Sequence, residues 1–202
     1  MLSCLGNYLD REFDTLTQNG ADVEGFLNLL LSVVQSPSLV VSIPVLVTWV
    51  RVLNNKKLGP LAANSHLVGP LLELCCARLI RFESLPEDTQ EQTFLFLVED
   101  TDTIPERHAF LGNYRRYSCQ ILEAMVQLKP SDVLYHILGQ AETMLQPLFD
   151  GQSPVDVANY NKDSMPILRI DAQFTAIESA LKGYVKWKQH APRTSEAVCI
   201  RI

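Results

Sequence analysis

The chain has 202 residues, of which 47% are hydrophobic and 20% are charged. This composition supplies enough apolar material for one folded domain and excludes an intrinsically disordered protein. The formal net charge of -6 disfavours nucleic-acid binding through overall charge, so any contact with a polyanion must use a local cationic patch.

Apolar residues recur every three or four positions along the first half of the chain, which is the spacing of a helix with one buried face. Asp22 and Ser38 stand where N-caps are needed, because their side-chain oxygens can accept from free backbone N–H groups. The pattern predicts four helices in this half: 2–17, 22–35, 38–54 and 65–84.

The stretch between Glu24 and Arg51 carries no charge and is long enough to cross a bilayer. Its centre, the run Gln35-Ser36-Pro37-Ser38, would place polar groups and a broken backbone in hydrocarbon, where each unsatisfied group costs several kcal/mol. The sequence therefore predicts two buried helices joined by a tight turn and no membrane insertion.

An acidic segment over 86–105 contains no Lys or Arg and is predicted to be an exposed, poorly packed linker. Three of its apolar residues are expected to dock onto neighbouring helices: Phe94, Leu95 and Leu97. Three of its carboxylates are candidate contacts for a basic partner, with an ordinary solvated loop as the alternative: Glu99, Asp100 and Asp102.

The second half of the chain continues the helical pattern. Thr103 and Glu106 form a capping box that starts a fifth helix ending near 128. Ser131 is the predicted cap of a sixth helix that ends at Gly151, and a seventh helix is predicted over 165–189. The expected buried face of this last helix consists of Ile170, Phe174, Ile177, Leu181 and Tyr184.

Seven helices joined by short turns, with almost no strand pattern, predict an all-α fold. The repeat period of about 40 residues favours an α-α superhelix of HEAT- or armadillo-like hairpins over 1–190, followed by a frayed tail over 191–202. Helices two and three, four and five, and six and seven are the predicted hairpins. A closed helical bundle is the alternative.

Cationic side chains occur on the fifth and seventh helices, which are both second members of their hairpins. Second members face one side of such a stack, and in a HEAT-type superhelix that side is concave. Arginine and lysine on a concave wall suit phosphate or carboxylate groups, although a solvated helix face is an equal alternative. The candidate cargo-binding residues are Arg107, Arg115, Arg116, Lys182 and Lys186.

No catalytic or cofactor-binding motif occurs in the sequence, which predicts a protein that is not an enzyme and that uses neither a cofactor nor a metal. A helical enzyme with unrecognised residues is the alternative, and it would gather His108, Asp100 or Cys119 in a deep pocket. The five cysteines form no CxxC pair, which favours free thiols in the cytosol or nucleus.

Four segments resemble the exportin-5 branch of the karyopherin-β nuclear transport receptors in its fungal form. They are EDTDT followed by PERHAFLGNYRRY over 99–117, SMPILRIDAQFTAIE over 164–178, LKGYVKW over 181–187, and the Ser-Pro-centred hairpin over 26–52. The resemblance implies a HEAT-repeat exportin that shuttles between nucleus and cytoplasm and passes nucleoporins. It further implies cooperative binding of Ran-GTP and cargo, with phosphoproteins and, in animals, hairpin RNA among the cargoes.

Receptors of this family are much longer than 202 residues, so the resemblance predicts an internal fragment. The first and seventh helices should then expose apolar side chains, because interior repeats bury both of their flanks. A generic HEAT-repeat interaction scaffold with no part in transport is the alternative function.

Overall fold

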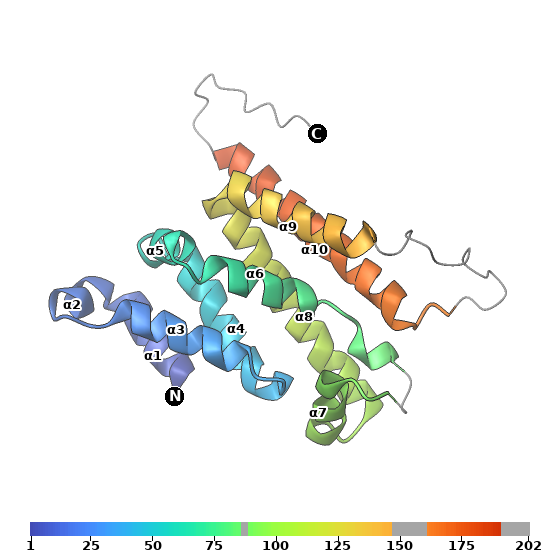
Figure 1. Ribbon diagram of the computed structural model, residues 1–202. Helices are drawn as coiled ribbons and strands as arrows, with labels where there is room; N and C mark the ends of the chain where they lie inside the picture. Colours follow the sequence, from blue (N-terminus) through green and yellow to red (C-terminus); the bar gives the residue numbers. More distant parts are fainter. Residues whose placement is uncertain (86–88, 147–160, 191–202) are drawn as a thin grey trace.

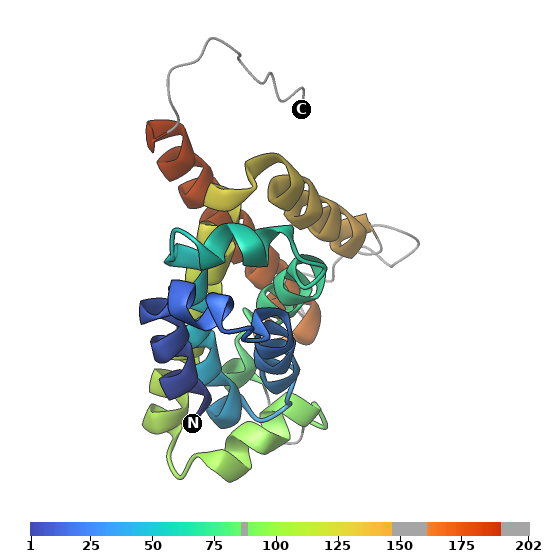
Figure 2. The same cartoon turned by 90° about the vertical axis from the view of Figure 1, so that its left-hand side faces the viewer.

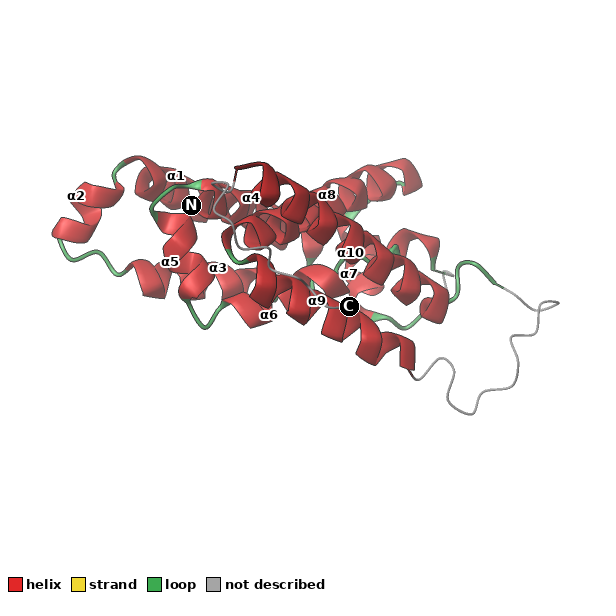
Figure 3. Cartoon of the chain, turned by 90° about the horizontal axis from the view of Figure 1, so that it is seen from above, coloured by secondary structure: helices red, strands yellow, loops and turns green. Residues whose placement is uncertain are grey.

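Figure 1 shows the computed structural model, which describes residues 1–85, 89–146 and 161–190. Within these ranges the backbone forms ten α-helices, one short 3-10 helix and no strand (Figure 3). The predicted tail over 191–202 and the predicted helix end at Gly151 lie outside the described residues.

The helices before the acidic segment are α1 (Leu2–Arg11), α2 (Phe13–Gln18), α3 (Val23–Val34), α4 (Leu39–Asn54), α5 (Leu58–Asn64), α6 (Val68–Ala77) and the 3-10 helix η1 (Phe82–Ser84). The remaining helices are α7 (Gln92–Asp100), α8 (Ile104–Leu128), α9 (Pro130–Leu145) and α10 (Met165–His190).

Four of these helices, α1, α4, α8 and α10, lie side by side in one row (Figure 1). Neighbouring helices in the row run in the same direction, because residues near the start of one helix contact residues near the start of the next, and residues near the ends contact each other. Ser3 of α1 donates to the Pro44 carbonyl of α4, and Asp10 at the end of α1 accepts from Asn55 just after α4. A second layer contains α3, α6 and α9, and Figure 2 looks along the stack from the α1 end.

Each helix of the second layer returns the chain to the start of the next row helix. The resulting hairpins are α3 with α4, α6 with α8, and α9 with α10, and each pair is in contact. The prediction of stacked antiparallel hairpins is therefore confirmed. The row is open rather than closed into a bundle, with α1 and α10 at its two ends (Figure 1).

Helix α10 approaches α8 so closely that small side chains are required on its contact face. A Cβ atom at Gly183 would lie 2.5 Å from the carbonyl oxygen of Glu123 and 2.9 Å from Cβ of Val126. The other residues buried on this face are also mostly small: Ala172, Ala176, Ser179 and Ala180.

The buried face predicted for the last helix is wrong at two of its five residues, whereas Ile170, Ile177 and Tyr184 are partly buried. Phe174 is 64% exposed and Leu181 is 55% exposed, whereas both were expected to face the core. The sequence rule places the largest apolar residues inward, but the α8 backbone leaves no room for them. Small residues therefore occupy the α8 contact, Phe174 and Leu181 are exposed, and Ile177 and Tyr184 pack partly buried against the core.

The first predicted helix is broken in two at Glu12, whose backbone leaves the helical region at φ -110° and ψ 27°. Close to this break the side chain of Asn55 donates to the backbone carbonyl of Asp10, which competes with the helical bond that this carbonyl would make. Ser38 does not cap α4 with its side chain as predicted, since its hydroxyl donates to Asp100 instead.

The segments around the middle of the chain also differ from the prediction. The helix expected over 65–84 is only α6, followed by η1, and α5 forms in a stretch that was given no structure. The acidic segment is not a linker, because α7 occupies its centre and buries Phe94 and Leu97. Helix α9 begins at Pro130 rather than after Ser131, since proline is well suited to the first helical turn.

The two end helices of the row expose apolar side chains, as predicted. On α1 the exposed residues are Leu5 at 46% and Tyr8 at 56%, and on α10 they include Val185 at 53%.

No α-helix in the described part of the chain is both long and apolar enough to cross a membrane by itself. Helices α4 and α5 meet the length and composition of a span only when taken together, and the chain bends by 104° between them. The two helices predicted on either side of the Ser36-Pro37 turn are α3 and α4, and both bury apolar faces in the core.

We predict that Gly183→Ala destabilises the protein by about 1–3 kcal/mol, because the added methyl group collides with the α8 backbone. Gly112→Ala is the matched control, since a Cβ atom there meets nothing within 4 Å and α8 should gain about 0.5–1 kcal/mol. Urea unfolding followed by circular dichroism measures both. Equal stability of the two variants would contradict the close approach of α8 and α10.

Candidate partner-binding surfaces

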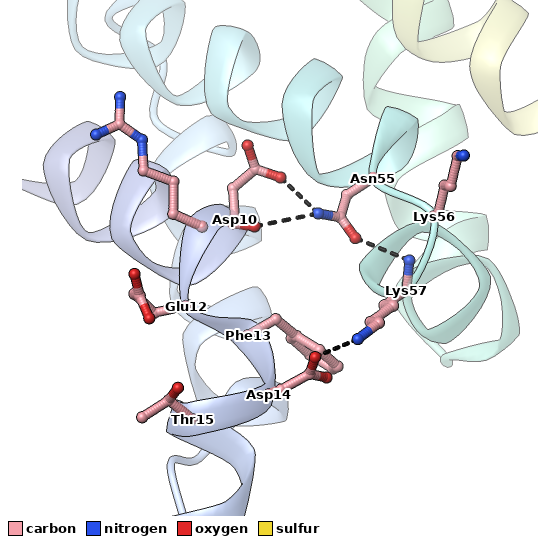
Figure 4. Close-up of a pocket in the computed structure, with 9 residues that line it drawn as sticks. Asp10, Glu12, Phe13, Asp14, Thr15, Asn55, Lys56 and Lys57 are labelled. Carbon is pink, nitrogen blue, oxygen red and sulfur yellow. Dashed lines mark hydrogen bonds and ion pairs between the residues drawn. The ribbon is translucent and has the colours of Figure 1, made fainter.

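An open pocket of about 360 Å³ lies between the α1–α2 junction and the α4–α5 turn (Figure 4). Asn55 dominates its wall: the side-chain amide donates to Asp10, and the side-chain oxygen accepts from the backbone N–H groups of Lys57 at 2.8 Å and Leu58 at 2.9 Å. Lys57 also pairs with Asp14. Asn55 and Lys57 thus join α1 and α2 to the α4–α5 turn.

The predicted acidic site residues lie at the C-terminal end of α7 and in the turn to α8. Glu99, Asp100 and Asp102 are all exposed, and none belongs to an ion pair with another described residue. Asp100 accepts a 2.8 Å hydrogen bond from the Ser38 hydroxyl, which ties the end of α7 to the start of α4. The three carboxylates are therefore held on ordered backbone.

Thr103 caps α8 as predicted, and the reciprocal bond of the capping box is shifted by one residue, because Glu106 accepts from Asp102 rather than from Thr103. The Thr103 hydroxyl accepts from the backbone N–H of Glu106 at 3.3 Å, and the Glu106 carboxylate accepts from the backbone N–H of Asp102 at 3.0 Å. The side chain of Asp102 is exposed and makes no hydrogen bond or ion pair with the part of the chain that the structure describes.

The three predicted arginines of α8 have different surroundings. Arg107 lies over the Phe94 ring at 5.7 Å and donates to Thr101, and Arg116 lies over the Tyr117 ring at 4.8 Å. Arg115 is turned toward η1, where it forms a 2.7 Å ion pair with Glu83, whose side chain is only 4% exposed. Sequence reasoning missed Glu83, because nothing in its local pattern points to a residue 32 positions away.

The two predicted lysines lie on α10 next to the α8 contact. Lys186 pairs with Glu123 of α8, and Lys182 forms a 2.8 Å ion pair with Glu178 one turn before it. The hydrogen bond to Glu178 raises the pKa of Lys182. The lysines retain 61% and 54% side-chain exposure, at Lys182 and Lys186 respectively, so both head groups remain accessible.

Sequence reasoning also missed Arg78, a buried arginine that connects three segments. Its guanidinium donates to the backbone carbonyl of Ser36 at 3.0 Å and to the Thr93 hydroxyl at 3.1 Å. It thereby joins the end of α6 to the α3–α4 turn and to the first turn of α7. A single arginine in a helical stretch gives no sequence signal for such a role.

The residues that a helical enzyme would have gathered lie apart. His108 is exposed in the second turn of α8, and Cys119 lies 11 residues further on, about 16 Å along the helix axis. Asp100 lies outside α8 and is bonded to Ser38. Among the residues that the structure describes, no group of three or more His, Cys, Asp or Glu side chains is placed to hold a metal ion.

Three cysteines lie where α6, α8 and α10 meet. Burial raises the pKa of Cys75 well above its usual range and that of Cys76 to about 12. Burial also raises the pKa of Cys119, although its hydrogen bond with Ser179 and the nearby charge of Lys182 act in the opposite direction. These thiols are packed as neutral side chains, and Cys4 is the exposed one of the four described cysteines.

Stacks of helical hairpins provide extended surfaces on which partners can be bound. The model of the Exportin-5 family matches residues 1–198. The chain therefore belongs to the Exportin-5 family, which is a family of nuclear transport receptors.

An uncharacterised protein of Schizosaccharomyces pombe is 28% identical to the chain over 95% of the chain's length. The alignment covers 16% of that relative, so the chain spans about one sixth of the length of the curated protein it matches.

We predict that stability falls as pH rises above about 8.5, where cysteine ionises in the unfolded chain. The folded-state pKa values of Cys75 and Cys76 are raised, so their contribution to stability is complete below pH 8.5 and is lost as the pH approaches 12. Within that window each such thiol should lower the free energy of unfolding by about 1.4 kcal/mol per pH unit.

Urea unfolding at a series of pH values measures this slope. Cys76→Ala should make the slope shallower by about 1.4 kcal/mol per pH unit. Cys4→Ala should leave the slope unchanged, because Cys4 is exposed. An unaltered slope in Cys76→Ala would show that this thiol does not stay neutral in the folded core.

Proposed function

We propose that the chain is a section of a nuclear export receptor that binds Ran-GTP and cargo together and shuttles between nucleus and cytoplasm. The match of residues 1–198 to the Exportin-5 family is the observation that carries this proposal. The stack of hairpins supports it, because such stacks provide long surfaces on which large partners can be bound. Passage through the pore would involve nucleoporins, and no enzymatic step is required.

The cationic residues of α8 and α10 are the proposed cargo contacts. Arg107, Arg116, Lys182 and Lys186 keep accessible head groups, while Arg115 would act mainly through its ion pair with Glu83. Exposed ion pairs are weak, so a phosphate group of a phosphoprotein or of structured RNA can replace the partners of Lys182 and Lys186 at little cost. Phosphoprotein cargo fits this arrangement best, since the overall charge of -6 opposes a long polyanion.

The carboxylates at the end of α7 are the proposed contacts for a basic partner, either Ran or a cargo protein. Glu99, Asp100 and Asp102 lie together at the end of α7 and form no ion pair with a described residue. Unpaired charges of one sign accelerate association with an oppositely charged partner, and salt screens this effect within about 8 Å at physiological ionic strength.

The test of the transport function is a binding assay with the intact gene product and Ran. An export receptor should retain Ran loaded with a non-hydrolysable GTP analogue, release Ran-GDP, and bind cargo more tightly when Ran-GTP is present. The alternative, a generic helical scaffold, predicts partner binding that is independent of the nucleotide on Ran. Nucleotide-independent binding would therefore replace the transport proposal by the scaffold.

For the cargo surface we predict that Arg116→Glu combined with Lys182→Glu weakens binding of a peptide carrying several phosphoserines by roughly tenfold or more. The slope of log affinity against log salt should become shallower, because fewer cations contact phosphate. Lys57→Glu, at the α4–α5 turn, is the control and should have little effect. An unchanged affinity and salt slope in the double variant would remove these residues from the cargo site.

A further inference from the structure

One edge of the molecule combines exposed apolar side chains with the unpaired carboxylates. On α7, Leu95 is 43% exposed and Val98 is 42% exposed, and they lie one turn apart on the same face. Ile104, the first residue of α8, is 57% exposed. We call this region the α7 edge surface, and it consists of Leu95, Val98, Ile104, Glu99, Asp100 and Asp102.

The start of α4 extends the apolar part of this surface. The hydrogen bond between Ser38 and Asp100 places the first turn of α4 beside the last turn of α7, and the two helices are in contact. Val40 and Val41 in that turn are 42% and 51% exposed. Five exposed apolar side chains thus lie around a single helix junction, which is more than the scattered residues of an ordinary surface.

The charge of the α7 edge surface is negative on balance, because its three carboxylates outweigh the Arg107 guanidinium and the positive N-terminal ends of α4 and α8 that lie beside it. The C-terminal end of a helix carries about half a negative charge, and the last turn of α7 contains no basic residue to offset it. Arg107 contacts the Phe94 ring and donates to Thr101 but keeps its positive charge, so it offsets one of the three carboxylates. The side chains of Glu99 and Asp102 make no hydrogen bond or ion pair with the described residues.

The surface is also held in place before any partner arrives. Phe94 and Leu97 anchor α7 in the core with 2% and 1% exposure, and Arg78 binds its first turn through Thr93. Asp100 is fixed to Ser38, and the capping box fixes the start of α8. A partner would therefore lose little affinity to the ordering of this surface.

We propose that the α7 edge surface binds a basic amphipathic segment of a protein partner. The apolar side chains of that segment pack on Leu95, Val98 and Ile104, and its lysines or arginines reach Glu99 and Asp102. Nucleic acid does not fit, because the surface has the same sign of charge as phosphate. This inference rests on the proposed function only in treating the partner as Ran or cargo, since the surface itself is defined by its own residues.

The experiment uses the 202-residue chain and a fluorescent peptide about 18 residues long, which is five helical turns, with leucine on one face and lysine on the other. Fluorescence anisotropy gives its affinity across a salt series. Leu95→Ser with Val98→Ser should weaken binding roughly tenfold. Glu99→Gln with Asp102→Asn should weaken it to a similar degree and should also flatten the salt dependence.

Two matched control variants distinguish binding at this surface from non-specific binding of the peptide. Phe174→Ser removes a more exposed apolar residue on α10, and Glu142→Gln removes an exposed carboxylate on α9. Neither should change the affinity, and a peptide with glutamate in place of lysine should not bind. Circular dichroism confirms that each variant is folded.

Failure of the basic peptide to bind, or equal losses in the control variants, would overturn the proposal. So would self-association of the chain that is abolished by Leu95→Ser with Val98→Ser, because the surface would then be covered by a second copy. The assay contains neither Ran nor nucleotide. Its failure would leave the transport proposal standing, and loss of the transport proposal would leave a positive peptide result intact.

Discussion

The contact between α8 and α10 sets the geometry on which the rest of the stack depends. Gly183 lets the α10 backbone reach the Glu123 carbonyl of α8, and the buried alanines in the turns before it keep the contact face small. Helix α8 in turn lies between α10 and α4, so its position fixes two neighbours at once. Phe174 and Leu181 of α10 are exposed, whereas the residues that face α8 are small.

The charged residues divide into those that hold the stack together and those that remain available. Glu83 is almost fully buried beside Arg115, and Arg78 donates to two segments from the interior. Lys182, Lys186 and Arg116 have contacts that are exposed and therefore weak. The acidic residues at the end of α7 form no ion pair with any described residue, so their carboxylates remain available.

Helical periodicity was sufficient to predict the class of fold, the α3–α4 hairpin and the long helices α8 and α10. It failed where the preferred residue depends on a distant segment. Phe174 and Leu181 fit an inward face on α10, but the α8 backbone excludes them. Helix α7 was not predicted, because acidic residues flank its short apolar run, although Phe94 and Leu97 have the spacing of one buried helical face. The candidate residues were identified by charge alone, which cannot reveal that Arg115 would be drawn inward by Glu83.

Because α1, α4, α8 and α10 all run in the same direction, the chain must travel back along the stack before it can start each new helix of the row. The return from α8 to α10 is made by α9, whereas the return from α4 to α8 uses α5, α6, η1 and α7. The second layer can therefore accept insertions and changes in the path of the chain without disturbing the row. A shift of α10 by one residue would instead place a larger side chain at the position of Gly183, against the α8 backbone. The register of the row is therefore the part of the structure that can change least.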